Sequence, residues 1–277
     1  MRIDDRRPDD RPVFVRHHHV GRCAGPQVPV VHGFSAVVFY VDGRAEVEQR
    51  GRVRVAAGDV QIVPAGEAHR TICGGGAEAW GVGFDPVYLA ASEHAGLLDP
   101  FERVRAGAAA VLPIPAERQE HLRRVIAELR EESAQAPTAL QAQVQRSLLT
   151  LVLAEVVRAT PVGGESTQAP LVAQALRYIE RRCLAPISLR DVAAALDRSP
   201  AYVTTALRVA TGRTAQQWIA VGRLAEARRR LLTSDETVEA IAGRVGGLDP
   251  THFIRMFRRE HGCTPAAWRA EHRRPRA

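Results

Sequence analysis

The sequence predicts an α+β protein of two domains, in which an N-terminal antiparallel β-barrel leads into a helical hairpin and an all-α domain follows. Three observations support this prediction. Short β-branched runs separated by turn residues fill roughly the first third of the chain. Helical spacing of apolar residues begins near Ala116. A C-terminal segment repeats in outline about fifty residues later, which indicates one structural unit used twice. The 277 residues are enough for two domains that each bury a core.

The strand-rich segment covers residues 14–84. Its β-branched and aromatic runs are broken by the pairs Asp42-Gly43, Arg50-Gly51 and Gly58-Asp59. Turn residues at intervals of roughly eight residues are typical of an antiparallel barrel or sandwich. We assign the barrel to residues 1–112.

Two apolar-striped helices follow over residues 113–158, separated by Pro137. Their apolar faces could pack on the barrel, on each other or on a second copy of the chain. We predict a homodimer whose interface is the stripe Leu140, Val144, Leu148 and Leu151.

The next segment, residues 159–170, reads ATPVGGESTQAP. It is rich in Pro, Gly, Ser and Thr and has no apolar period, so we predict a linker there. The C-terminal domain then covers residues 171–277.

Positive charge is concentrated in that C-terminal domain. Residues 171–277 hold 19 Arg against 10 Asp and Glu, whereas the whole chain has a net charge of +7, so residues 1–170 are slightly acidic. A basic domain beside a near-neutral one indicates a polyanionic partner for the basic domain.

Other composition signals exclude several classes of protein. Cys23, Cys73, Cys183 and Cys263 form no CxxC pair, so we expect buried free thiols rather than a zinc or redox motif. No apolar run is long enough to cross a bilayer, and the N-terminal residues lack an apolar signal-peptide core. We therefore expect a cytoplasmic protein with no membrane partner.

The repeated unit aligns residue by residue. The first copy starts at Val192 and reads VAAALDRSPAYVTTALRVATGRTAQQW. The second starts at Ile241 and reads IAGRVGGLDPTHFIRMFRREHGCTPAAW. Ser199-Pro200 aligns with Asp249-Pro250, and the second copy has one extra residue in its turn.

Each copy predicts a helix, a tight turn and a second helix. In the first copy Ser188 caps a helix over residues 189–196, and Asp197-Arg198 forms the turn. Ser199 caps the second helix, which begins at Pro200 and ends at Gly212. Such a pair is typical of a helix-turn-helix motif, and we place the two motifs at residues 188–211 and 237–261.

A long helix joins the motifs, from the Thr214 cap to about Leu232. At 1.5 Å per residue it spans roughly 27 Å. That length is close to the ~34 Å between successive major grooves on one face of B-DNA. One chain could therefore present two recognition helices to adjacent grooves.

Six stretches follow one another through nearly the whole C-terminal domain: ISLRDVAAAL, SPAYV, TGRTAQQWI, RLAEARRRLL, TVEAIAGRVG and HFIRMFRREHGCTPAAWR. In these stretches the domain resembles the DNA-binding domain of the AraC/XylS family of bacterial transcription regulators. Gly247 lacks the family's aromatic residue, Leu207 replaces a Phe, and Asp197 replaces a Gly in the first turn. We expect the change at Gly247 to loosen the packing beneath the second motif.

Helix geometry identifies candidate DNA contacts. Residues in the first turn of a recognition helix approach base edges, and later ones approach phosphates. We expect Arg255 to contact a guanine, because its guanidinium matches O6 and N7. The full set is Ala201, Thr204, Thr205 and Arg208 in the first recognition helix, and Pro250, Thr251, Arg255, Arg258 and Arg259 in the second.

A motif in the barrel indicates a binding cavity. Residues 58–69 read GDVQIVPAGEAH, with the spacing G-x5-P-x-G-x2-H, which resembles the second motif of cupins and directs His69 toward the barrel mouth. The earlier metal-binding motif is missing, and a metal site needs three or four ligands, so we expect neither a metal nor another cofactor. The sensing barrels of the family resemble metal-free cupins. The candidate effector-binding residues are His19, His32, Phe34, Tyr40, His69 and Trp80.

These features together predict a transcription regulator without catalytic residues. A small-molecule effector would bind in the barrel, the hairpin would dimerise, and the C-terminal domain would bind double-stranded DNA at promoters or operators. RNA polymerase is a further candidate partner. Two alternatives stay open: a metal-dependent cupin enzyme with a helical appendage, and a DNA-binding protein whose barrel only dimerises.

Overall fold

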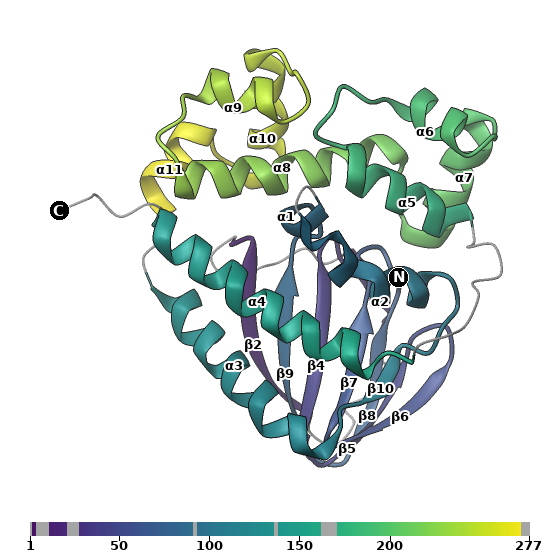
Figure 1. The fold of residues 1–277 in the computed structure, drawn as a ribbon. Helices are drawn as coiled ribbons and strands as arrows, with labels where there is room; N and C mark the ends of the chain where they lie inside the picture. Colours follow the sequence, from purple (N-terminus) through teal and green to yellow (C-terminus); the bar gives the residue numbers. More distant parts are fainter. Residues whose placement is uncertain are drawn as a thin grey trace.

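Two antiparallel sheets form the N-terminal module (Figure 1). The computed structural model describes residues 2–3, 11–20, 28–90, 93–135, 138–161 and 171–272. The strands are β1 (Arg2–Ile3), β2 (Val13–Val20), β3 (Val30–Val31), β4 (Ser35–Asp42), β5 (Arg44–Glu48), β6 (Arg52–Ala56), β7 (Asp59–Val63), β8 (Arg70–Gly74), β9 (Ala77–Phe84) and β10 (Val111–Pro113). The larger sheet has the order β10-β7-β4-β9-β2 and the smaller one β6-β5-β8, while β1 and β3 form a short parallel pair.

The antiparallel architecture that the turn residues predict is confirmed, and the finer resemblance to a cupin stays a prediction. Gly43, between β4 and β5, has a φ of +70°. A Cβ atom there would lie 2.7 Å from the Cα of Ala77, so the close approach of the two backbones requires glycine.

The larger sheet is covered on both faces, and the predicted hairpin covers one of them. Helices α3 (Ala116–Ala134) and α4 (Ala139–Ala159) pack in the main core with Val37, Phe39 and Val82 of the sheet. The opposite face is directed toward the smaller sheet, where Tyr40 and Ala79 share a core with Val47 and Val55. Because both faces are covered, β4 reads as a nearly continuous apolar run.

The fold divides the apolar stripe that we expected at a dimer interface. Leu148 is only 8% exposed inside the main core, and Val144 packs at the edge of that core. Leu140 is 72% exposed and Leu151 is 45% exposed. The reason is that α4 covers the sheet, so one side of the apolar stripe is buried against it. The expected interface therefore cannot include Leu148, and only Leu140 and Leu151 remain on the solvent face.

The C-terminal module is entirely helical in the residues that the structure describes. Its helices are α5 (Leu171–Arg182), α6 (Leu189–Ala195), α7 (Pro200–Thr211), α8 (Ala215–Thr233), α9 (Val238–Arg244), α10 (Pro250–His261) and α11 (Pro265–His272). Helix α8 contributes to two separate cores, one beneath α6 and α7 and one beneath α9 and α10. Among the described helices, none is both long and apolar enough to span a bilayer.

The cysteines differ in part from the expectation of buried free thiols. Cys183 is a buried free thiol, and Cys263 is free and half-buried. Cys73 is disulfide-bonded, so the expectation is wrong there. Its side chain lies at the exposed end of β8, where the argument from burial does not apply. Cys23 lies outside the described residues.

The two modules pack directly against each other, with α5 and α8 over one end of the barrel (Figure 1). Most of the predicted linker, residues 162–170, lies outside the described residues. Two short helices, α1 (Val87–Ala90) and α2 (Asp99–Arg105), flank the 3-10 helix η2 (Glu93–Leu98) on the barrel side. One hydrophobic cluster spans the contact and contains Val31, Ala65 and Val87 of the barrel with Leu176, Ile179 and Trp218 of the helical module.

Buried ion pairs reinforce this apolar contact. Arg105, which is 2% exposed, donates hydrogen bonds to both carboxylate oxygens of Glu180 at 2.7 and 2.6 Å. It also donates to the carbonyl oxygen of Ala65 at 2.9 Å. A second buried pair joins Arg228 of α8 to Asp85, with 3.3 Å between Nη2 and Oδ2. Both pairs link the barrel to the helical module across long sequence separations.

The Arg105–Glu180 pair generates the first prediction. Arg105→Gln leaves the Glu180 carboxylate at the contact without its cation, so the free energy of unfolding should fall by about 3–5 kcal/mol. Urea unfolding of the full chain measures this loss. The matched control is Arg177→Gln, because Arg177 is 46% exposed and lies 3.6 Å from Glu102 at the same contact. It should cost about 0–1 kcal/mol. Equal losses for the two variants would contradict a special role for the buried pair.

Candidate nucleic-acid interface and barrel cavity

The structure contains two helix-turn-helix units at the predicted positions, α6 with α7 and α9 with α10. Ser188 and Asp191 form a capping box at the start of α6. Asp197 occupies the turn with a φ of +51°, the left-handed conformation that Asp tolerates better than most residues. Ser199 caps α7, and Pro200 occupies its first turn. The predicted caps are therefore confirmed in the first unit.

The second unit is built in the same way. Thr237 caps α9, and Asp249 caps α10 ahead of Pro250. Gly247 has a φ of +63°, and a Cβ atom there would meet no heavy atom within 4 Å. Gly247 itself is exposed, and the looser packing that we expect beneath the second motif stays a prediction. Phe253, Phe257 and Trp268 fill that core with edge-to-face ring contacts.

Helix α7 presents a polar face to solvent. Val203 and Leu207 are fully buried and hold the helix on its core. The predicted contact residues lie on the other side, where Ala201, Thr205 and Arg208 are exposed and Thr204 is half-buried. This face is not covered by the barrel, which contacts α5 and α8 instead.

Helix α10 presents the equivalent face, with more positive charge. Phe253, Met256 and Phe257 are buried. Of the predicted contact residues, Pro250 is half-buried, whereas the exposed ones are Thr251, Arg255, Arg258 and Arg259. Among the described residues, no acidic side chain forms a salt bridge with Arg255, Arg258 or Arg259. By contrast, Arg229 and Arg230 of α8 both pair with Glu226.

Two exposed side chains in the first turns of these helices were not among the predicted contacts. Tyr202 is 56% exposed and His252 is also exposed, and the sequence repeat aligns them with each other. Their backbone N–H groups donate to the capping side chains of Ser199 and Asp249. Both residues therefore lie where a recognition helix approaches base edges. The signal was present in the sequence, because each residue comes three positions after its predicted cap.

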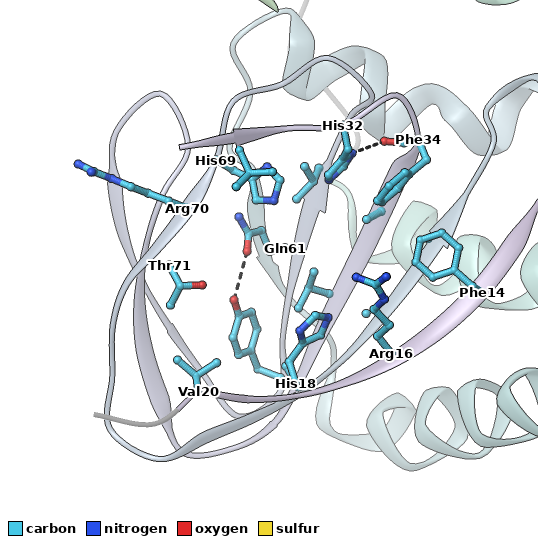
Figure 2. Close-up of a pocket in the computed structure, with 18 of the residues that line it drawn as sticks. Phe14, Arg16, His18, Val20, His32, Phe34, Gln61, His69, Arg70 and Thr71 are labelled. Carbon is cyan, nitrogen blue, oxygen red and sulfur yellow. Dashed lines mark hydrogen bonds between the residues drawn. The ribbon is translucent and has the colours of Figure 1, made fainter. Parts of the chain in front are cut away.

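A cavity of about 260 Å³ lies between the two sheets of the barrel (Figure 2). Four of the predicted effector-binding residues line it: His32, Phe34, Tyr40 and His69. His19 and Trp80 do not. Side chains along a strand alternate between its faces, and the cavity face of β2 carries Phe14, Arg16 and His18.

The alternation of side chains along a strand also explains the positions of Trp80 and His19. On β9 the cavity face carries Ala79, Gly81 and Gly83, so Trp80 lies on the opposite face, where the guanidinium of Arg130 on α3 lies 4.8 Å from its ring centroid. His19 is exposed beside Glu78. The sequence shows that the side chains of β2 alternate between two faces. It does not show which face lines the cavity, because that depends on the face that Phe14 occupies.

The polar groups of the cavity largely bond to protein atoms. Tyr40 donates to Oε1 of Gln61 at 3.1 Å, and Gln61 donates to Oε1 of Gln49 at 2.9 Å. The Nδ1 atom of His32 lies 2.6 Å from the carbonyl oxygen of Phe34, and the two rings stack. Burial lowers the pKa of His69, which favours its neutral form.

Other ionisable side chains also line the cavity. Burial lowers the pKa of His18, and the neighbouring charge of Arg16 lowers it further. Arg70 pairs with Glu48. Among the described residues, no group of three or more His, Cys, Asp and Glu side chains is arranged to hold a metal ion.

The cavity wall is continuous with the contact between the modules. The backbones of Val30 and His69 exchange hydrogen bonds at 2.8 and 3.0 Å, and the N–H of Gly66 donates to the carbonyl oxygen of His32 at 2.9 Å. Gly66 has a φ of +83°, and a Cβ atom there would lie 2.9 Å from Leu176 and 3.1 Å from Trp218. Residues that line the cavity are thus bonded to a turn that touches the helical module.

Parts of the chain are similar to known proteins. Residues 192–271 match the family described as helix-turn-helix domain. Transcriptional activator NphR from Rhodococcus sp. is 40% identical over 90 residues, which are 32% of this chain and 27% of NphR. The HTH-type transcriptional activator RhaS from Klebsiella pneumoniae is 31% identical over 147 residues, which are 53% of this chain and 52% of RhaS.

A solved structure is also similar to part of this chain. The DNA-binding domain of AdpA, a global transcriptional factor in complex with a target DNA, is 34% identical. The match covers 36% of this chain and 87% of that chain, with a TM-score of 0.32. The chain thus spans about a quarter of the length of NphR and about half of the length of RhaS.

Proposed function

The chain belongs to the AraC/XylS family of transcription regulators, and from this membership we propose that it binds specific sites in double-stranded DNA under the control of a small molecule. One observation carries the proposal. The two recognition helices, α7 and α10, present equivalent exposed faces at the ends of a single connecting helix. The 19 residues of α8 span about 28 Å, close to the spacing of successive major grooves.

Control by an effector is supported by the path from the cavity to the helical module. A ligand between the sheets would contact the wall that contains His32 and His69, and this wall is bonded to the Gly66 turn. A ligand changes DNA affinity only if it binds two arrangements of the protein with different affinities. Docked and undocked positions of α5 and α8 on that turn are two such arrangements.

Two further parts of the proposal concern partners. A homodimer would form through the solvent face of α4, where Leu140, Leu151 and Val157 are exposed. Linking two DNA-binding modules in this way raises the effective concentration of the second once the first has bound. RNA polymerase is the partner expected of a regulator that acts at promoters. No catalytic residue is proposed.

The DNA-binding proposal predicts a bipartite site and a steep dependence on salt. Arginine–phosphate contacts release counterions, so the affinity of the full chain should fall about 100- to 1000-fold between roughly 50 and 200 mM salt. Footprinting should show two short protected elements about one helical turn apart per protomer. Binding that ignores salt, or a footprint confined to one groove, would refute the use of both motifs.

A third prediction tests the equivalent positions Thr205 and Arg255. Arg255→Ala should cost about 1–3 kcal/mol of binding and relax specificity at one base position, whereas Thr205→Ala should act less strongly in the other half of the site. Competition binding with single-base variants of the site measures both effects. Arg54→Ala on β6 is the control, because it removes the same charge from an exposed position on the barrel. Equal losses on specific and random DNA would make Arg255 a phosphate contact.

A fourth prediction tests the dimer. Leu151→Arg places a charge in the proposed interface, so sedimentation velocity should show a monomer with unchanged thermal stability. Leu148→Arg should instead unfold the barrel, because Leu148 lies in the core. Glu128→Arg adds the same side chain to the exposed face of α3 and should leave the dimer intact. A folded Leu151→Arg dimer would place the interface elsewhere.

A further inference from the structure

The outer faces of the two recognition helices differ in charge. Helix α7 contains a single arginine, Arg208, and no acidic residue, whereas α10 contains three arginines. The repeat aligns Thr205 with Arg255 and Val209 with Arg259. At two of the three aligned positions, a cation of α10 is therefore replaced by an uncharged side chain in α7.

The uncharged face of α7 also carries exposed apolar surface. Among the described residues of the helical module, the large hydrophobic side chains that are exposed are Tyr202, at 56%, and Val209, at 78%. Together with Thr205 they are spaced three and four residues apart, so the three side chains share one face of the helix. Val203 and Leu207 are buried on the other side. This apolar surface of α7 is therefore directed to solvent rather than to the core of the module.

Tyr202 is placed to contact a base. It lies in the first turn of α7, the part of a recognition helix that approaches base edges. Its backbone N–H donates to the Ser199 hydroxyl, and within the described part of the chain its own hydroxyl forms no hydrogen bond. Ala201 and Thr205 are exposed on the same solvent side of α7. An aromatic ring and two side chains that carry methyl groups are thus presented together.

These side chains match thymine better than guanine. Thymine presents a methyl group in the major groove, and alanine, the methyl group of threonine and aromatic rings contact it through apolar surface. Guanine instead presents two acceptors, which a guanidinium binds with two parallel hydrogen bonds. Arg255 supplies a guanidinium in α10, whereas the aligned position in α7 is Thr205.

We propose that the DNA site is chemically asymmetric: α7 recognises thymine methyl groups through Ala201, Tyr202 and Thr205, and α10 recognises guanine through Arg255. This inference rests on the proposed function, in which both recognition helices enter major grooves. It makes Tyr202 a specificity-determining residue of the first motif. The two halves of the site then differ in the kind of contact that discriminates between bases, apolar in one half and hydrogen-bonded in the other.

Modified bases test the proposal in one half of the site at a time. The probe is a duplex of roughly 30 base pairs that the full chain selects from a randomised pool. Replacing thymine by uracil removes only the methyl group, and replacing guanine by 7-deazaguanine removes the N7 acceptor. In competition binding, uracil should weaken one half only, by about 4-fold for each contacted methyl group. 7-Deazaguanine should weaken the other half only, by about 10-fold or more.

Variants assign each half to its helix. Tyr202→Ala should reduce the effect of uracil to less than about 2-fold at one thymine, because the apolar contact is gone. The matched control on α10, His252→Ala, should leave the effect of uracil unchanged. Thr205→Arg is an independent test: it gives α7 the side chain that α10 has at the aligned position, so the preferred base there should change from thymine to guanine. All three positions are exposed, so no core contact is lost.

Three outcomes would overturn the asymmetry: uracil is tolerated in both halves, 7-deazaguanine weakens both halves equally, or Tyr202→Ala leaves the effect of uracil intact. Each of them leaves the proposed function standing, because the selected duplex is still bound specifically. If the full chain selects no consensus sequence from the pool, the proposed function is refuted and the asymmetry with it.

Discussion

The contact between the Pro64–Gly66 turn and helices α5 and α8 is the constraint on which the rest of the structure depends. Gly66 approaches Leu176 and Trp218 so closely that a side chain at this position would require Leu176 to move, and its backbone conformation is left-handed. Arg105 secures the same turn by donating to the carbonyl oxygen of Ala65 while it pairs with Glu180. The orientation of α8 on the barrel, and with it the direction of both recognition helices, follows from this contact.

The sequence predicted the features that depend only on residues close together in the chain. Ser188, Ser199 and Asp249 cap helices because their side chains accept backbone N–H bonds within the next turn, and this requires no knowledge of the fold. Gly212 and Gly262 end helices in the left-handed conformation for an equally local reason. The repeat then assigns the same roles to both motifs, so the two motifs and the helix between them were predictable, whereas α5 and α11 were not assigned.

Features that depend on distant partners could not be predicted in this way. The alternation on β2 shows that His17 and His19 share a face, but only pairing with β9 shows that this face is outside the cavity. Leu148 was predicted to belong to a surface stripe, because the sequence of α4 does not show that a sheet covers that side of the helix. The pairs Arg105–Glu180 and Asp85–Arg228 join residues 75 and 143 positions apart, and no local pattern connects them.

In the proposed function, the same long-range contacts would connect the cavity to the distant recognition helices. The recognition faces of α7 and α10 lie away from the barrel, so a ligand cannot touch them. Under the proposal, it would act by changing how firmly α5 and α8 are held at the Gly66 turn. Buried ion pairs suit this role, because they are stable while both partners stay in place and costly once one partner moves away. Coupling between the sites then equals the difference in ligand affinity between the docked and undocked arrangements. If the barrel and the helical module had only one relative position, there would be no such difference in ligand affinity.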